Sequence, residues 1–435
     1  MLKFNRIFVL IAISSLGIAS GCGGGSTGNT RGSSGSGGSG GTNTVNNVAT
    51  LTVDRGPLAL LAAGQADEDM AFVTVTVCVP GTSSCQSIDH VQVDTGSEGL
   101  RLASGVLTQV SLQTQMSGTN PVSECAQFGD LTYLWGTVAT ADIQIAGEVA
   151  KNVPIQIADG STAPSSCSSG ETGQLVTAAD VGANGILGVG LFRQDCGFGC
   201  TQNAPPAFYY SCGNGTCSSI SESLTAQLQN PVWMFPGDNN GVILQLPSVP
   251  ATGQATASGQ LIFGIGTQSN NGVGSAVVLP VDSHTGNFAA QFAGVTYNDF
   301  DKPGSGGGSS FIDSGSNGYF FLDSATLVNA GFPIPDCPSS SNLQGFYCPT
   351  PTQPISVTVI GDTSSGTPSG ASRTINFNVA NAQTLFQSGF SAFNNVGGDN
   401  SNSFDFGLPF IFGKTVLFGI EGQTTPAGTG PFFAF

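Results

Sequence analysis

One short pattern occurs twice in this chain and constrains its fold more than any other feature. The first copy is Asp94-Thr95-Gly96-Ser97 and the second is Asp313-Ser314-Gly315-Ser316; apolar residues precede both. A single Asp-Thr-Gly triplet indicates only a turn, because Asp and Gly are common turn residues. Two ordered copies of the same pattern indicate an internal duplication instead.

A second part of the repeat follows each motif at the same distance. Gly185-Ile-Leu-Gly188 lies downstream of the first motif, and Asp405-Phe-Gly407-Leu408 lies downstream of the second. In both halves, 94 residues separate the Asp of the motif from the later Gly, Gly188 or Gly407. The duplication therefore predicts two similar halves whose turns each offer one carboxylate, and two such turns can meet across an interface.

Both motifs resemble the active-site signatures of pepsin-like aspartic proteases, and the downstream segments resemble those that cross behind the signatures in each lobe. Fainter similarity extends from about Ala71 to the C-terminus. Residues 407–435 do not resemble an ordinary pepsin end, so the chain is more similar to a divergent bacterial lipoprotein branch of the superfamily. The resemblance implies an all-β, mostly antiparallel fold: a bilobal double barrel with a central cleft and few short helices.

Composition agrees with a β-rich fold of two lobes. The 435 residues suffice for two lobes of ordinary size. Val, Ile, Phe and Thr occur in short runs between clusters of Gly, Asn, Ser and Pro, which is typical of strands and turns. We expect an N-terminal lobe over residues 48–250 and a C-terminal lobe over residues 251–435. One short helix is predicted over 323–331, with Gly331 as its stop.

The N-terminus has the features of a bacterial lipoprotein signal. Residues 1–21 combine two basic residues, a short apolar run and small residues immediately before Cys22. This resemblance implies cleavage before Cys22, a lipid on that residue, and export to the cell envelope. Gly23 after the Cys favours the outer membrane, and the membrane would be contacted through the lipid only. Ordinary secretion with an incidental Cys is the alternative. Residues 22–47 are rich in Gly and Ser and predict a flexible tether.

Cysteine usage also indicates an oxidising compartment. There are 11 Cys, and assigning Cys22 to lipid leaves an even number. Three local disulfides are predicted, while the connectivity of Cys125, Cys167, Cys196 and Cys200 stays open; the predicted pairs are Cys78–Cys85, Cys212–Cys217 and Cys337–Cys348. Metal binding is the competing interpretation of the cysteine clusters, but no His lies near them. We therefore predict no metal and no cofactor.

Charge and motif content argue against several other functions. The net charge is −17 with only 10 Lys and Arg, so nucleic acid is not an expected partner. The Gly-rich stretches lack the Lys-Ser/Thr ending of a phosphate-binding loop. No Gly-x-Ser-x-Gly elbow with a partnered His is evident, and the chain has only two His.

Two carboxylates brought within a few ångström can catalyse hydrolysis without a metal or a covalent intermediate. They cannot both ionise cheaply, so Asp94 and Asp313 would share one proton. The ionised member activates water while the protonated member polarises a peptide carbonyl. Gly96 and Gly315 would let the two turns approach closely, because neither has a side chain.

The family resemblance gives the neighbouring residues their expected roles. Thr95 and Ser314 would lock the two loops together, and Ser97 and Ser316 would donate to the outer oxygens of the two Asp. The stretch 128–136 resembles the hairpin that closes over the cleft.

Tyr133 is the candidate for the flap tyrosine of the family, and Phe128 and Trp135 are other possible equivalents. Each of these aromatics could instead simply pack the hairpin. Arg101 departs from the family, which favours Trp at this position.

The sequence thus predicts a lipid-anchored aspartic endopeptidase that acts on extended peptide or unfolded protein. The alternative is a catalytically inactive envelope lipoprotein of pepsin fold that binds a peptide or a glycan.

Overall fold

The computed structural model describes residues 46–202, 205–297, 309–363, 368–401 and 403–435. Across these residues the chain is mostly β, largely antiparallel, with few short helices, which confirms the predicted fold class at that level. The predicted signal peptide, Cys22 and nearly all of the predicted tether lie outside the described residues.

The strands of the N-terminal part range from 2 to 14 residues in length. They are β1 (Val48–Val53), β2 (Ala71–Cys78), β3 (Cys85–Asp94), β4 (Glu98–Leu102), β5 (Gln113–Thr114), β6 (Met116–Ser117), β7 (Asn120–Gln127), β8 (Thr132–Ile145), β9 (Glu148–Ala158), β10 (Gly173–Leu175), β11 (Gly185–Val189), β12 (Tyr209–Gly213), β13 (Thr216–Ser219), β14 (Gly241–Gln245) and β15 (Ala257–Phe263). The strands after them are β16 (Val278–Pro280), β17 (Ala289–Phe292), β18 (Val295–Tyr297), β19 (Ser309–Ile312), β20 (Tyr319–Phe320), β21 (Gln353–Asp362), β22 (Pro368–Val379), β23 (Gly397–Gly398), β24 (Ser403–Phe406), β25 (Thr415–Gly419), β26 (Thr424–Thr425), β27 (Gly428–Thr429) and β28 (Phe432–Ala434).

Helices are confined to short connections. The α-helices are α1 (Leu58–Ala62), α2 (Ser165–Ser168), α3 (Ala178–Val181), α4 (Ser324–Asn329) and α5 (Ala382–Phe386), and the 3₁₀ helices are η1 (Gly197–Thr201), η2 (Pro231–Met234), η3 (Ser339–Ser341) and η4 (Leu408–Phe410). Helix α4 confirms the helix predicted over 323–331: Asp323 caps its first turn by accepting from the Thr326 N–H at 2.9 Å. None of the helices in the described part of the chain is long and apolar enough to cross a membrane.

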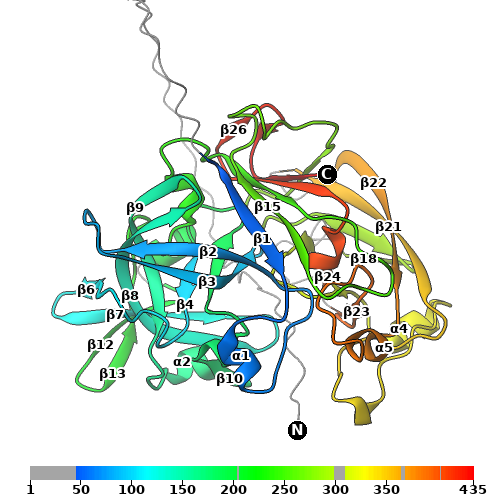
Figure 1. Ribbon diagram of the computed structural model, residues 1–435, viewed down its shortest axis with the longest axis horizontal. Helices are drawn as coiled ribbons and strands as arrows, with labels where there is room; N and C mark the ends of the chain where they lie inside the picture. The colour runs from blue at the N-terminus through cyan, green and yellow to red at the C-terminus, as the bar shows by residue number, and fades with distance from the viewer. Residues whose placement is uncertain (1–45, 203–204, 298–308, 364–367, 402) are drawn as a thin grey trace, which may run out of the picture.

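Strands from both ends of the chain form one continuous antiparallel layer. Strand β15 pairs with β1 and β14, β14 pairs with β25, and β28 pairs with both β25 and β16. Figure 1 shows β1 and β15 side by side near the centre of the molecule. Although β15 follows residue 250, its partners β1 and β14 precede that position, so this layer joins the two parts of the chain.

The two motif regions have the same strand arrangement. In the N-terminal part, β11 runs parallel to β3 and antiparallel to β4, with Gly188 opposite Asp94. In the C-terminal part, β24 runs parallel to β19 and antiparallel to β20. The Asp313 N–H donates to the Phe406 carbonyl at 3.1 Å, which continues the β19–β24 pairing to the second motif. Each Asp therefore lies at the end of a strand that a downstream strand braces.

The core behind these strands is apolar and rich in aromatic side chains. Phe404 and Phe406 of β24 are fully buried and stack at 4.6 Å between ring centroids, and Phe321 stacks on Phe404 at 4.9 Å. A fully buried Phe contributes about 1.5–3 kcal/mol relative to an exposed one. Alternation of inward and outward side chains along β24 thus fixes which residues point away from the core.

Five disulfides connect ten cysteines of the described chain. The three predicted local pairs, Cys78–Cys85, Cys212–Cys217 and Cys337–Cys348, are confirmed. The connectivity that the sequence left open is Cys125–Cys167 and Cys196–Cys200. The Cys125–Cys167 bond ties β7 to α2 across a sequence separation of 42 residues.

Candidate active site

The loops that follow β3 and β19 bring Asp94 and Asp313 together. A Cβ added to Gly96 would lie 2.6 Å from Cγ of Asp313, and one added to Gly315 would lie 2.7 Å from Oδ1 of Asp94. Each carboxyl group therefore occupies the space that a side chain on the opposite loop would fill. Only Gly permits this approach, as the sequence predicted.

Thr95 and Ser314 link the two loops by reciprocal hydrogen bonds. The Thr95 N–H donates to Oγ of Ser314 at 3.1 Å, and the Ser314 N–H donates to Oγ1 of Thr95 at 2.9 Å. Each hydroxyl then donates to a carbonyl of the opposite strand: Thr95 to Ile312 at 3.2 Å and Ser314 to Val93 at 2.7 Å. Because these four bonds are buried, losing any one would leave a polar group unsatisfied.

Each motif also supplies donors to its own carboxyl group. Gly96 N–H donates to Oδ1 of Asp94 at 2.9 Å, and the Ser97 hydroxyl donates to Oδ2. In the second loop, Gly315 N–H donates to Oδ1 of Asp313 at 2.7 Å, and the Ser316 hydroxyl donates to Oδ2 at 3.2 Å. Each carboxyl group thus accepts hydrogen bonds from the Gly amide and the Ser hydroxyl of its own motif.

Both carboxyl groups of the pair are buried. Asp94 is 2% exposed and Asp313 is 1% exposed. Burial raises the pKa of Asp313 well above its ordinary value, and the nearby charges of Asp94 and Asp405 and a hydrogen bond with Asp94 raise it further. These effects favour the protonated form of Asp313 when the pair carries one negative charge.

Arg101 belongs to a buried ionic network behind the first loop. Its guanidinium donates to Glu124 at 2.6 Å, to the carbonyl of Glu98 at 2.8 Å and to Asp195 at 3.4 Å. Tyr209 donates to both oxygens of Asp195. Burial opposes the charge on Arg101, but Glu124 and Asp195 raise the pKa of the guanidinium. The residue that replaces the expected Trp therefore connects β4 to the hairpin strand β7.

The β7–β8 hairpin contains the predicted flap residues. Tyr133 packs in a buried cluster with Trp135, Tyr210 and the Cys125–Cys167 disulfide, and its hydroxyl donates to Gln174 at 3.4 Å. Phe128, at the end of the hairpin, lies in a different cluster.

That cluster includes Ile186 of β11, the strand that braces the first motif. Phe128 therefore belongs to the cluster that contains a residue of the bracing strand, and Tyr133 does not.

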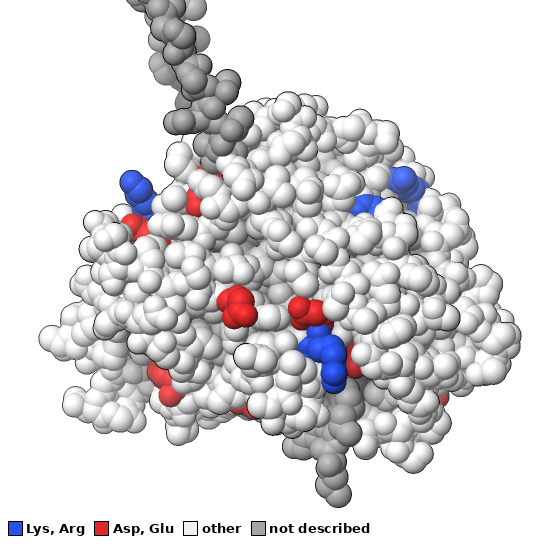
Figure 2. Space-filling view, viewed as in Figure 1, with Lys and Arg blue, Asp and Glu red and all other residues white. Residues whose placement is uncertain are grey.

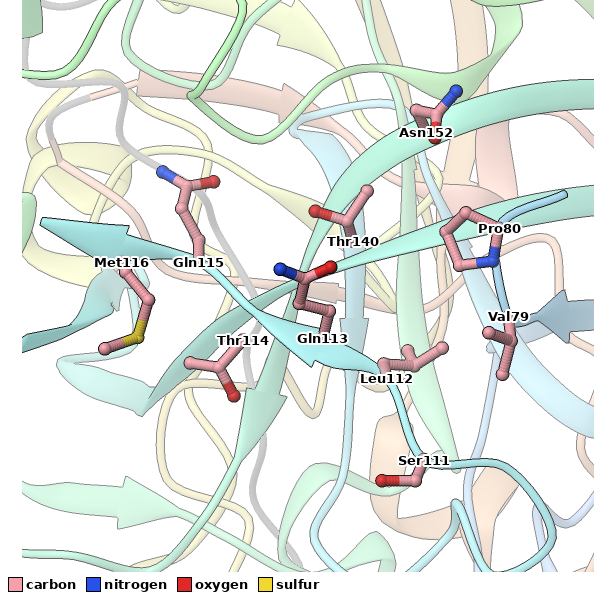
Figure 3. A pocket seen from close by; sticks show the side chains of 10 residues that line it. All are labelled: Val79, Pro80, Ser111, Leu112, Gln113, Thr114, Gln115, Met116, Thr140 and Asn152. Atoms are coloured by element: carbon pink, nitrogen blue, oxygen red, sulfur yellow. The ribbon is translucent and has the colours of Figure 1, made fainter.

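A separate hollow of about 530 Å³ lies beside β5 and β8. Figure 3 shows the neutral side chains that line it, including Gln113, Thr140 and Asn152. None of its lining residues belongs to the Asp94 or Asp313 loop. On the face in Figure 2, charged side chains are scattered, and no broad basic surface is visible.

The described residues contain no group of three or more His, Cys, Asp or Glu side chains placed to hold a metal ion. Sequence comparison finds that the family model DUF3443, described as a protein of unknown function, matches residues 43–435. No curated protein matches the chain.

Proposed function

We propose that this chain, which belongs to the DUF3443 family, is an aspartic endopeptidase that hydrolyses extended peptide or unfolded protein. The observation that carries the proposal is the contact of the two motif loops. Each carboxyl group lies against the Gly of the other loop, and reciprocal Thr95–Ser314 bonds fix that contact. A merely structural pair of turns has no need to bury two carboxyls beside one another, since this arrangement is electrostatically costly.

The unequal protonation of the pair suits the addition of water to a peptide bond. Asp94 takes a proton from water as the water oxygen bonds to the peptide carbon, and Asp313 gives its proton to the carbonyl oxygen. In the second step the proton on Asp94 moves to the amide nitrogen and one hydroxyl proton returns to Asp313. The C–N bond then breaks, and both carboxyls regain their starting states.

The proposal extends to the architecture and the location of the protein. The repeated strand arrangement and the shared antiparallel layer support a bilobal, pepsin-like double barrel with lobes over 48–250 and 251–435. Substrate would lie extended in a cleft between these lobes. Five disulfides support an oxidising compartment, in keeping with export and a lipid on Cys22 that holds the enzyme in the cell envelope, at the outer membrane.

The test is hydrolysis of an unfolded protein from about pH 3 to about pH 8, covering the range in which carboxyl pairs titrate. Asp94→Asn and Asp313→Asn should each lower kcat/KM by a factor of about 10²–10⁴, because each removes a proton-transfer group. Asp159→Asn changes an exposed carboxylate and is the matched control. Circular dichroism establishes that all variants are folded. Equal activity in wild type and both dyad variants would refute the assignment.

A binding function without catalysis is the second candidate. The buried packing of Tyr133 favours it, because the candidate flap tyrosine is then held in a cluster with Trp135 and Tyr210. The uncharged amide and hydroxyl groups of the hollow in Figure 3 would suit a glycan or a peptide. This envelope lipoprotein would show no turnover at any pH. A ligand would stabilise wild type and the Asp→Asn variants alike.

A further inference from the structure

A third carboxyl group lies beside the Asp94–Asp313 pair. Asp405 belongs to β24, between β19 and β20, and its nearest cross-strand residues are Phe311 and Phe320. It is 0% exposed, and neither of its carboxyl oxygens has a hydrogen-bond partner of ordinary geometry. A carboxyl group buried in this way is costly unless it carries a proton or has a function that compensates for the cost.

The groups that face Asp405 are those of the two motifs. The hydroxyl of Ser316 lies close enough to influence its ionisation, although no bond between them satisfies the usual distance and angle limits. The charge of Asp94 acts on Asp405, and Asp405 in turn acts on Asp313. The residues opposite it on β19 and β20 are aromatic, so the dyad supplies the charge in its surroundings.

The corresponding strand position of the first half carries no carboxyl group. Asp405 stands two residues before Gly407, and its counterpart in the first half is Ile186, two residues before Gly188. Ile186 is 1% exposed and packs in an apolar cluster. The same strand position thus accepts an apolar side chain in one half and carries a carboxyl group in the other.

We infer, on the basis of the proposed protease activity, that Asp405 is a positioning residue that keeps the shared proton on the Asp94–Asp313 pair as the pH rises. At low pH, Asp405 is neutral and the pair carries one negative charge. As the pH rises, the next carboxyl group to ionise is Asp405, and the Asp94–Asp313 pair still holds its one proton. The charge on Asp405 then opposes ionisation of Asp313, because like charges repel at short range.

Two pKa shifts agree with this geometry. Burial raises the pKa of Asp405 well above its ordinary value; Ser316 lowers it, and the charge of Asp94 raises it. Burial also raises the pKa of Asp313, with Asp94 and then Asp405 adding to the effect. Without Asp405, the second charge would have to come from the catalytic pair itself, and the active protonation state would be lost at lower pH.

The decisive measurement is the pH profile of kcat/KM for wild type, Asp405→Asn and Asp405→Ile. Both substitutions should move the alkaline limb down by about one pH unit, the size of shift that a nearby charge produces, and leave the acidic limb in place. Glu148→Gln is the control, because this carboxyl is 4% exposed and has Asp238 as its charged neighbour. The inference would be overturned if the alkaline limb of the kcat/KM profile stayed in place in both Asp405 variants, or if only KM changed.

Infrared spectroscopy tests Asp405 independently of turnover. The absorption of a protonated carboxyl carbonyl should be present in wild type at about pH 6 and reduced in Asp405→Asn. If wild type hydrolyses nothing, the proposed function fails, while this spectrum still reports whether Asp405 holds a proton. A spectrum in which Asp405→Asn and wild type are identical from about pH 4 to about pH 8 would refute the protonated state.

Discussion

Replacing Glu98 with Gln should stabilise the protein at neutral pH. Glu98 begins β4, directly after the first motif, and is 9% exposed. Its Oε1 accepts the Phe192 N–H at 3.1 Å. Burial raises the pKa of Glu98 to about 8; the Phe192 bond opposes the shift, and the charge of Asp94 adds to it. Gln preserves the oxygen acceptor and cannot ionise, so the substitution isolates the cost of the buried acid.

The sign follows from proton counting. In the unfolded chain Glu98 ionises near its ordinary value of 4.5, whereas in the folded protein it keeps its proton to about pH 8. The folded state therefore binds more protons between these values, and stability falls as the pH rises through this range. At about 1.4 kcal/mol per pH unit, the free energy of unfolding of wild type at pH 7 is about 3 kcal/mol lower than it would be without this titration.

Urea unfolding of wild type and Glu98→Gln at about pH 4 and about pH 7 measures the difference, provided that the m-values agree. The variant should be more stable by up to about 3 kcal/mol at neutral pH and nearly equal at acidic pH. Asp159→Asn, at an exposed position, should show no such pH-dependent gain. A stability difference between wild type and Glu98→Gln that is the same at both pH values would refute the reasoning.

Two further perturbations test the loop contact and the disulfide framework. In Gly96→Ala, the new Cβ would lie 2.6–2.8 Å from the Asp313 carboxyl, so kcat/KM should fall by about 10²-fold. Gly173→Ala is the control and should retain activity, because its Cβ would meet nothing within 4 Å. Activity of Gly96→Ala equal to that of wild type would contradict the contact argument. Replacing both cysteines of Cys125–Cys167 with Ser should lower the free energy of unfolding, measured in urea, by about 4 kcal/mol, because this disulfide closes a long loop. The same replacement of Cys212–Cys217, which closes a short loop, should cost about 2 kcal/mol. Equal losses would argue against this account.

Sequence patterns predicted the features that depend on local order. The two Asp-hydroxyl-Gly-Ser motifs predicted two turns that approach closely, and the structure places Gly96 against Asp313 as expected. Three of the four disulfides of short separation were predicted because a hairpin or loop brings such cysteines together, whereas Cys196–Cys200 was left open. Short runs of Val, Ile, Phe and Thr between turn residues likewise predicted the β-rich class, because such runs are typical of strands.

Features that depend on distant packing were not accessible in this way. The Cys125–Cys167 pair required knowledge of where α2 lies relative to β7. Arg101 could be recognised as a departure from the family, but its partner Asp195 lies 94 residues away in sequence. Similarly, Tyr133 was the flap candidate and Phe128 a possible equivalent, and the structure places them in different apolar clusters.

The two motif regions share a strand arrangement but differ in the surroundings of their carboxyl groups. Ser97 and the Gly96 N–H both donate to Asp94. The Ser316 hydroxyl donates to Asp313 at 3.2 Å and also lowers the pKa of Asp405. Two buried carboxyl groups therefore share the single proton of this hydroxyl. The second motif therefore has fewer donors per buried carboxyl than the first, in keeping with the raised pKa of Asp313. In a symmetric pair either acid could activate water, whereas this asymmetry supports the proposed roles of Asp94 as base and Asp313 as proton donor.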